Sequence, residues 1–203
     1  MRKLLFAALL LAVSATAGLA QGTEYKRGEF GVGYSLNRVD TEGAFNPTAA
    51  NDDGENFHGF YLNGGYNFHR YAGVQAEFSH HRKTTDFQIA GSPATLEGRL
   101  TQGLFGVKFQ DNATETKVRP FARFLAGVGK AQGELRTAAV NSEDDDSGFA
   151  AVVGGGLAFR LNNTVDLTTS ADYNPIRLGD GGTTETTHNF RVGVGLTFRF
   201  GKK

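Results

Sequence analysis

The C-terminal segment of the chain constrains the fold more than any other feature. From Phe190 to Phe200 every second residue is apolar, and the intervening residues are arginine, glycine or threonine. Successive side chains of a β-strand point to opposite faces of a sheet, so this period of two predicts a strand with one wholly apolar face. Such a face needs lipid or a protein core to cover it.

Seven earlier segments show a comparable alternation. They are residues 29–37, 57–68, 72–82, 96–110, 118–131, 148–161 and 165–174. In each of them the apolar row faces one way, whereas glycines and polar residues face the other. The charged residues expected on this second face are Glu77, Lys108, Arg123, Arg160, Asp166, Asp172, Arg191 and Arg199. A soluble ligand-binding barrel would line its interior mainly with apolar side chains, so this polarity favours lipid outside the barrel and a polar interior.

The connections between these segments alternate in length. Residues 69–71, 111–117 and 162–164 form short connections, whereas residues 38–56, 83–95, 132–147 and 175–187 form long ones rich in Gly, Asn, Asp, Thr and Ser. Tight turns at one end and long loops at the other are typical of membrane barrels. The sequence therefore predicts an all-β fold, an eight-stranded antiparallel up-and-down transmembrane β-barrel.

Aromatic residues near the short turns support the same prediction. They resemble the aromatic girdle that lies at a membrane interface. The residues are Tyr66, Phe68, Tyr71, Phe109, Phe121, Phe159, Phe198 and Phe200.

The N-terminus has the features of a secretory signal peptide. Arg2 and Lys3 precede an apolar stretch that is too short to span a membrane, and small residues follow up to Ala20. We therefore expect residues 1–20 to be cleaved and residues 21–203 to form one barrel domain. Of the 21 basic residues, cleavage removes two and leaves 19 against 21 acidic residues, a balance that argues against nucleic acid as a partner.

The chain resembles the small outer-membrane β-barrel superfamily, which includes the OmpA membrane domain, OmpX-like proteins and many porin-family proteins. The likeness rests on residues 66–68, 71–78, 119–129, 154–161 and the final strand. It implies a location in the cell outer membrane, with outer-membrane lipids and lipopolysaccharide as partners. It also implies that Arg191, Gly193, Leu196 and Phe198 form the signal read by the outer-membrane insertion machinery. The tail Gly201-Lys202-Lys203 departs from the usual terminal aromatic residue.

Two residue groups have the composition of a functional site. Glu77, Ser79 and His81 share one face of a predicted strand and contain the residue types of nucleophilic catalysis. That face should point into the barrel, away from lipid, so an inward polar network is the favoured interpretation. Glu143 to Asp146 place four carboxylates in a predicted loop, where they either bind a hard cation or simply meet solvent. We assign no catalytic, cofactor-binding or metal site.

The expected function is therefore non-enzymatic. The barrel would anchor surface loops for interaction or adhesion with an extracellular ligand, or support the integrity of the envelope. Two alternatives stay open at this point: a narrow pore or transporter for small solutes, and a lipid A-modifying enzyme.

Overall fold

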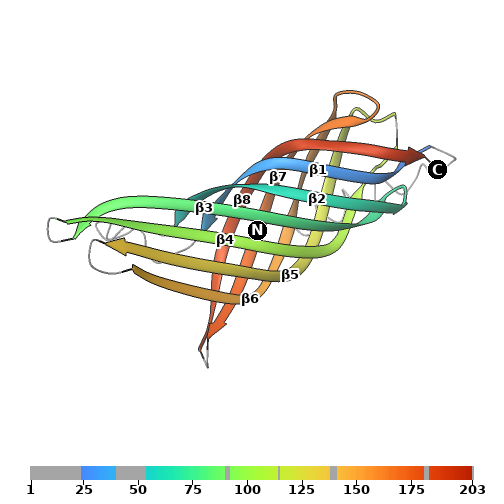
Figure 1. Ribbon diagram of the computed structural model, residues 1–203. Coiled ribbons are helices and arrows are strands. Elements are labelled where there is room, and N and C mark those ends of the chain that lie inside the picture. The colour runs from blue at the N-terminus through green and yellow to red at the C-terminus, as the bar shows by residue number, and fades with distance from the viewer. Residues whose placement is uncertain are drawn as a thin grey trace, which may run out of the picture.

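The computed structural model describes residues 24–39, 54–89, 92–113, 115–137, 141–180 and 183–202. Within these residues the chain forms a closed antiparallel barrel in which each strand pairs with its neighbours in sequence and β1 pairs with β8 (Figure 1). The strands are β1 (Lys26–Val39), β2 (Glu55–His69), β3 (Ala72–Ile89), β4 (Ser92–Gln110), β5 (Val118–Thr137), β6 (Asn141–Arg160), β7 (Val165–Asp180) and β8 (Thr183–Lys202). The predicted fold class is confirmed. Among the described residues no helix is long and apolar enough to cross a membrane.

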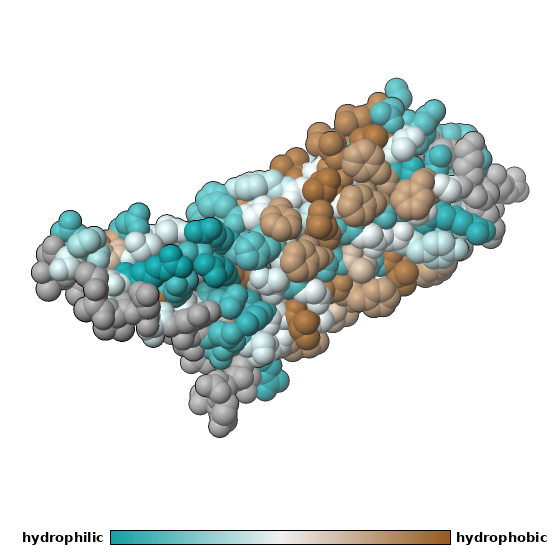
Figure 2. All heavy atoms as spheres, in the orientation of Figure 1, coloured by the Kyte–Doolittle hydropathy of each residue, from teal (hydrophilic) through white to brown (hydrophobic). Residues whose placement is uncertain are grey.

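The outer surface carries the apolar rows that the alternation predicts. On β8, Phe190, Val194 and Phe200 are exposed, whereas Arg191 and Arg199 are buried in the interior. Figure 2 shows apolar side chains as a band across the visible face of the barrel, with hydrophilic side chains toward both ends. An apolar belt facing outward and a polar interior are the arrangement of a membrane barrel.

The prediction that Phe121 belongs to the aromatic girdle is wrong. Phe121 is 8% exposed and lies inside the barrel, where the ammonium of Lys108 is 5.3 Å from its ring centroid. Phe121 shares the inward face of β5 with Arg123 and Leu125, so its position follows from strand parity. A cation over an aromatic face is a favourable contact in a desolvated interior.

Most strands run further than the sequence predicts. The expected loops at 83–95, 132–147 and 175–187 are largely strand, because β3 and β4 stay paired to Ile89 and Ser92, and β5 and β6 to Arg136 and Asn141. These extensions carry polar residues on both faces, so apolar alternation does not reveal them. Figure 1 shows the hairpins of β3–β4 and β5–β6 running out together, while the β7–β8 hairpin, paired up to Asp180 and Thr183, runs out in another direction. Most of the expected first loop, residues 40–53, lies outside the described residues.

The C-terminal tail continues β8 instead of projecting from it. Lys202 is the register partner of Lys26. Gly201, which lies between Phe200 and Lys202, has a φ of 69°. A left-handed backbone conformation favours glycine. The departure from a terminal aromatic residue is thus accommodated by extra pairing with β1.

Apolar side chains also occupy part of the interior, which the sequence analysis did not predict. Leu100, Leu104, Leu125, Ala150, Val152 and Ile176 form a buried cluster contributed by β4 to β7. The strand positions of its members place the cluster in the half of the lumen that is remote from the short turns. It fills the lumen there to the close packing typical of a protein core.

Candidate functional site in the barrel interior

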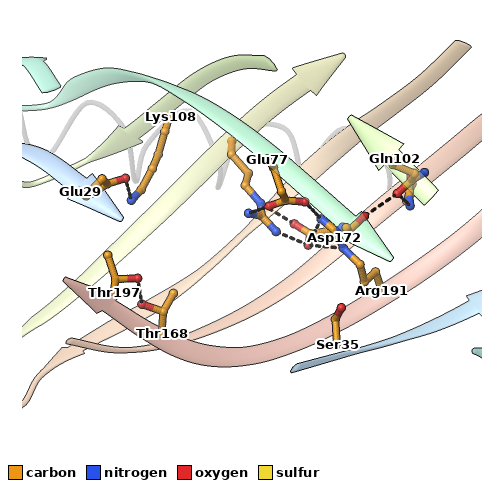
Figure 3. A network of polar contacts seen from close by, with 12 residues as sticks. Glu29, Ser35, Glu77, Gln102, Lys108, Thr168, Asp172, Arg191 and Thr197 are labelled. Carbon is orange, nitrogen blue, oxygen red and sulfur yellow. Dashed lines mark hydrogen bonds and ion pairs between the residues drawn. The ribbon is translucent and has the colours of Figure 1, made fainter. Parts of the chain in front are cut away.

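Four charged side chains cross the middle of the lumen as a closed network, which we call the central layer: Glu77, Arg123, Asp172 and Arg191. Arg123 donates to Glu77 over 2.7 Å and to both oxygens of Asp172 over 3.0 and 2.6 Å. Arg191 donates to Glu77 over 2.6 Å and to Asp172 over 3.3 Å. The four side chains come from β3, β5, β7 and β8, and Figure 3 shows Glu77, Asp172 and Arg191 pointing toward one another. Two guanidinium groups meet two carboxylates, so the charges of the layer balance.

A glycine makes this network possible. Gly154 on β6 lies between Arg123 and Asp172 in the register of the three strands. A Cβ at Gly154 would collide with the Asp172 carboxylate. Because glycine leaves this space open, Arg123 reaches across an entire strand to form its paired hydrogen bonds.

A second group of charges, the lower layer, lies nearer the short turns and consists of Glu29, Lys108, Arg119, Arg160, Asp166 and Arg199. Lys108 and Glu29 form an ion pair over 2.6 Å, visible in Figure 3, and Arg119 pairs with Asp166. Arg199 donates to the backbone carbonyl of Asn112 over 2.7 Å. Four of these inward charges, on β4, β6, β7 and β8, are predicted from the sequence, whereas Glu29 and Arg119 are not. Glu29 lies two residues before the inward Gly31 and Arg119 four residues before the inward Arg123, so strand parity extended to the strand ends is the signal that finds them.

The residues suspected of catalysis do not form a catalytic arrangement. Ser79 donates to Gln102 over 3.3 Å, whereas the histidine two residues later pairs with Ser35 over 2.8 Å. Glu77 belongs to the central layer, as described above. Both serines and His81 are at most 1% exposed. The three residues therefore share the predicted inward face, but each is engaged with a different partner.

The acidic segment at Glu143–Asp146 lies in β6 and not in a loop. Its pairing with β5 places Asp145 within 2.6 Å of Lys130 on the exposed face. The side chains of Glu143 and Asp144 lie outside the described residues, so cation binding by this segment stays a prediction. Among described residues, no group of three or more His, Asp or Glu side chains has metal-binding geometry.

Ion pairs also cover the outward face of the extended strands. Glu97 accepts from Arg82 over 2.9 Å and from Arg99 over 2.6 Å. Arg136 binds Glu134 over 2.6 Å, and this hydrogen bond lowers the pKa of that carboxyl below its usual range. The Arg136–Glu134 pair is exposed and contributes little to stability, whereas Glu97 is buried beneath its two arginines.

A closed antiparallel barrel with an apolar belt and a polar lumen is the architecture of an outer-membrane protein. Residues 5–198 match the family model described as "Outer membrane protein beta-barrel domain". The chain belongs to that family, and its place is the outer membrane. A search of curated proteins finds no match.

Solved structures show the same fold at low sequence identity. The attachment invasion locus protein Ail of Yersinia pestis is 19% identical, with a TM-score of 0.58, and the match covers 89% of this chain and 100% of Ail. Neisserial surface protein A is 11% identical, with a TM-score of 0.51 and coverage of 85% and 97%. A major outer membrane protein from Thermus thermophilus is 9% identical, with a TM-score of 0.53 and coverage of 85% and 99%. These likenesses establish the fold.

Proposed function

We propose that this protein is a non-enzymatic surface-interaction protein whose extended strands bind a partner outside the cell. The observation that supports this proposal most strongly is the continuous pairing of β3, β4, β5 and β6 beyond the apolar belt. The extension forms a four-stranded sheet, which we call the outer sheet, from residues 83–89, 92–99, 131–137 and 141–147. A rigid sheet above the membrane is a better platform for recognition than separate loops.

The edges of the outer sheet suggest how a partner binds. β2 pairs with β3 up to the contact of His58 with Arg82, and β7 pairs with β6 up to the contact of Leu178 with Gly148. Beyond these points the two outer strands have no further strand partner among the described residues. An open edge accepts an extended segment of another protein through backbone hydrogen bonds.

The two edges differ in charge. The β6 edge includes the acidic segment 143–146, whose run of like charges in the sequence disfavours strand addition. The β3 edge has one cation, Lys83, and one anion, Asp86, among Thr84, Thr85, Phe87 and Gln88, so it has no such run. We infer that the β3 edge is the binding edge and that the partner is a protein segment.

A polyanion is the less favoured ligand for this face. Ail of Yersinia pestis was solved with the heparin analogue sucrose octasulfate, and it resembles this chain at 20% identity. Here, however, basic residues of the outer sheet are matched by nearby carboxylates, as in the pairs Arg99 with Glu97 and Arg136 with Glu134. This balance gives a sulfated polymer no net attraction.

The experiment is a deletion that preserves register. Removing residues 84–89 and 92–97 shortens the β3–β4 hairpin while keeping Lys83 opposite Gly98. Cells carrying this variant should lose adhesion to host cells and matrix proteins. The control deletes 132–137 and 141–146, a comparable length of the β5–β6 hairpin, and should retain adhesion. Equal adhesion of the first variant and the intact protein, with both present in the outer membrane, would contradict the proposal.

The lipid A-modifying enzyme receives no support from the interior geometry, because the serine and histidine residues are buried in separate contacts. Mass spectra of lipid A from matched strains with intact and doubly substituted Ser79 and His81 test this directly. We expect identical spectra.

We also propose that residues 1–20 are removed on export, that the final strand is read by the insertion machinery, and that lipopolysaccharide surrounds the belt.

A further inference from the structure

We propose that the lower layer of the barrel interior binds a small monovalent inorganic anion of the chloride class. The first observation is a charge imbalance. Lys108, Arg119, Arg160 and Arg199 are cationic, whereas Glu29 and Asp166 are the carboxylates buried among them in the described part of the chain. Arg160 is half-buried at the mouth, so the deeply buried part of the layer carries one excess positive charge and the whole layer carries two.

The imbalance does not depend on side-chain rotamers. Two carboxylates neutralise two cations in any arrangement, and Asp111, a further acid at this end, is hydrogen-bonded to Arg70 over 2.9 Å. Arginine also cannot escape the cost of burial by losing its proton. A buried unpaired charge is strongly destabilising, so an external counter-ion is the remaining way to compensate the excess.

Unpartnered donors point to the same ligand. Nε and Nη1 of Arg119, Nε of Arg160 and Nε of Arg199 are buried and have no hydrogen-bond partner among the described residues. Arg119 is fully buried and pairs through Nη2 with a single oxygen of Asp166, and Nε of Arg199 lies 3.8 Å from that same oxygen. Arg160 is the register partner of Asp166, so its backbone lies beside the same carboxylate-bearing residue. The other oxygen of Asp166, Oδ1, also lacks a partner among the described residues. If one of the arginines donated to it, the positive charges of the layer would still outnumber the negative ones.

The central layer provides an internal comparison. It has equal numbers of guanidinium and carboxylate groups, and a single nitrogen, Nη1 of Arg191, is without a partner there. The same barrel therefore satisfies buried arginines where the charges balance, and leaves their donors open where they do not. This contrast locates the anion in the lower layer.

The neighbouring cavity has a lining suited to such an ion. It lies between the two layers and is lined by Lys108 and Arg123 together with the hydroxyl groups of Tyr61, Thr168 and Thr197, and no carboxylate is in its wall. In Figure 3, Lys108, Thr168 and Thr197 lie on the same side of the central layer as Glu29. The space admits one water-sized particle, and Arg119, Arg160 and Arg199 are not among its lining residues, so an ion bound to their open donors lies beside this space and not in it.

Thermal unfolding of the purified protein in detergent tests the proposal. The midpoint is measured by heat-modifiable migration in sodium chloride and in sodium gluconate at equal ionic strength. Because a ligand stabilises the state that binds it, the midpoint should rise by about 3 °C for each tenfold increase in chloride above its dissociation constant. Bromide should act like chloride, and gluconate, which is too large, should not.

Two asparagine substitutions provide a matched pair. Asn112 is buried beside Arg199, and Asn112→Asp supplies an internal negative charge with almost no change in shape. This variant should be more stable at low chloride and should lose most of the chloride response. Asn37 is equally buried but lies on β1, at the opposite end of the lumen, so Asn37→Asp should keep the full response.

Direct localisation completes the test. Crystals soaked in bromide should show an anomalous scattering peak beside Arg119 or Arg199. Equal midpoints in chloride and gluconate would overturn the proposal, as would an unchanged chloride response in Asn112→Asp. A bromide peak confined to the exterior of the barrel would do the same.

Discussion

Individual residues of the interior differ in how completely they are paired. Glu77 accepts from two arginines and is 4% exposed, so it is the carboxylate that joins β3 to the opposite side of the barrel. Removing one partner of such a network leaves buried charge without compensation, and this cost exceeds the net value of the pair itself. The central layer is therefore a stability element that tolerates little change.

The first prediction concerns that carboxylate. Glu77→Gln should lower the free energy of unfolding by about 3–5 kcal/mol, because Arg123 and Arg191 lose a charged acceptor. Urea-induced unfolding of the protein in lipid vesicles measures the change. Ser79→Ala, two residues along the same inward face, is the control and should cost about 1 kcal/mol. Equal effects of the two substitutions would show that the network contributes no special stability.

A second residue-scale prediction concerns acid stability at the turns. Asp111 is partly buried, which alone would raise its pKa, but hydrogen bonds from Arg70 and the Ala113 amide outweigh burial and lower it. Because the folded-state pKa is below the unfolded value, the pair stabilises the protein above the unfolded pKa. That contribution is lost as the pH falls through the folded-state pKa.

Asp111→Asn should therefore lower the thermal midpoint slightly at neutral pH and flatten its decline below about pH 4. The effect at neutral pH should stay within about 1 kcal/mol, since the pair is partly exposed to solvent. Thermal midpoints measured across the acid range compare the variant with the intact chain. Parallel curves for the two proteins would contradict the assignment.

At the scale of the strand, glycines have two distinct roles. Gly103 and Gly106 lie on β4 but face opposite sides of the wall. A Cβ at Gly103 meets nothing within 4 Å, whereas a Cβ at Gly106 would overlap the Phe124 carbonyl of the neighbouring strand. The sequence predicted small inward residues because the interior is crowded. The structure adds that at Gly106 the crowding comes from backbone and not from a side chain.

The third prediction contrasts these two glycines. Gly106→Val should destabilise the barrel by about 1–3 kcal/mol or block its assembly, because the backbone of β5 must move. Gly103→Val should be neutral or stabilising, since a valine favours a strand and meets lipid there. The amount of folded protein in the outer membrane, read from heat-modifiable migration, distinguishes the variants. A larger loss for Gly103→Val would mean that the two faces have been assigned the wrong way round.

The fourth prediction tests the position of the belt along one strand. Val153 and Ser147 face outward on β6, but the first is in the apolar belt and the second is in the outer sheet. Val153→Arg should cost about 2–4 kcal/mol near the middle of the membrane, whereas Ser147→Arg should cost almost nothing. Folding yields in lipid vesicles provide the measurement. Similar yields for both variants would place the membrane elsewhere on β6.

The physical cause of the apolar alternation explains which parts of the structure can be predicted from the sequence and which cannot. Lipid imposes a strict apolar alternation, so the eight spanning segments and their inward charges were predictable from residues such as Val192 and Arg191. Solvent imposes no such pattern on the outer sheet, and its strands, for example residues 83–89, were predicted as loops. Pairing partners inside the lumen depend on shear between distant strands, so the contact of His81 with Ser35 was beyond reach.

The whole molecule has two ends with different properties and a closed interior between them. The lumen is filled in succession by the lower layer, the central layer and the apolar cluster around Leu125 and Ile176. An eight-stranded barrel is just wide enough for side chains to fill it, so closure is the expected consequence of strand number. A closed lumen is consistent with the proposed surface interaction and with a bound ion small enough to fit between the side chains.

The fifth prediction follows from this closure. The protein reconstituted in planar bilayers should show no stable conductance, because opening a path requires separation of the ion pairs in the lower and central layers and displacement of the apolar cluster. Leu125→Gly, which removes a fully buried side chain of the apolar cluster, should still not conduct, since the two charged layers stay paired. Reproducible conductance of the intact chain that changes on substitution of Arg123 or Glu77 would favour a transport protein over a surface-interaction protein. Conductance restricted to a variant that combines Leu125→Gly with Arg123→Gln would instead show that the two obstacles act in series, as their separate positions along the lumen require.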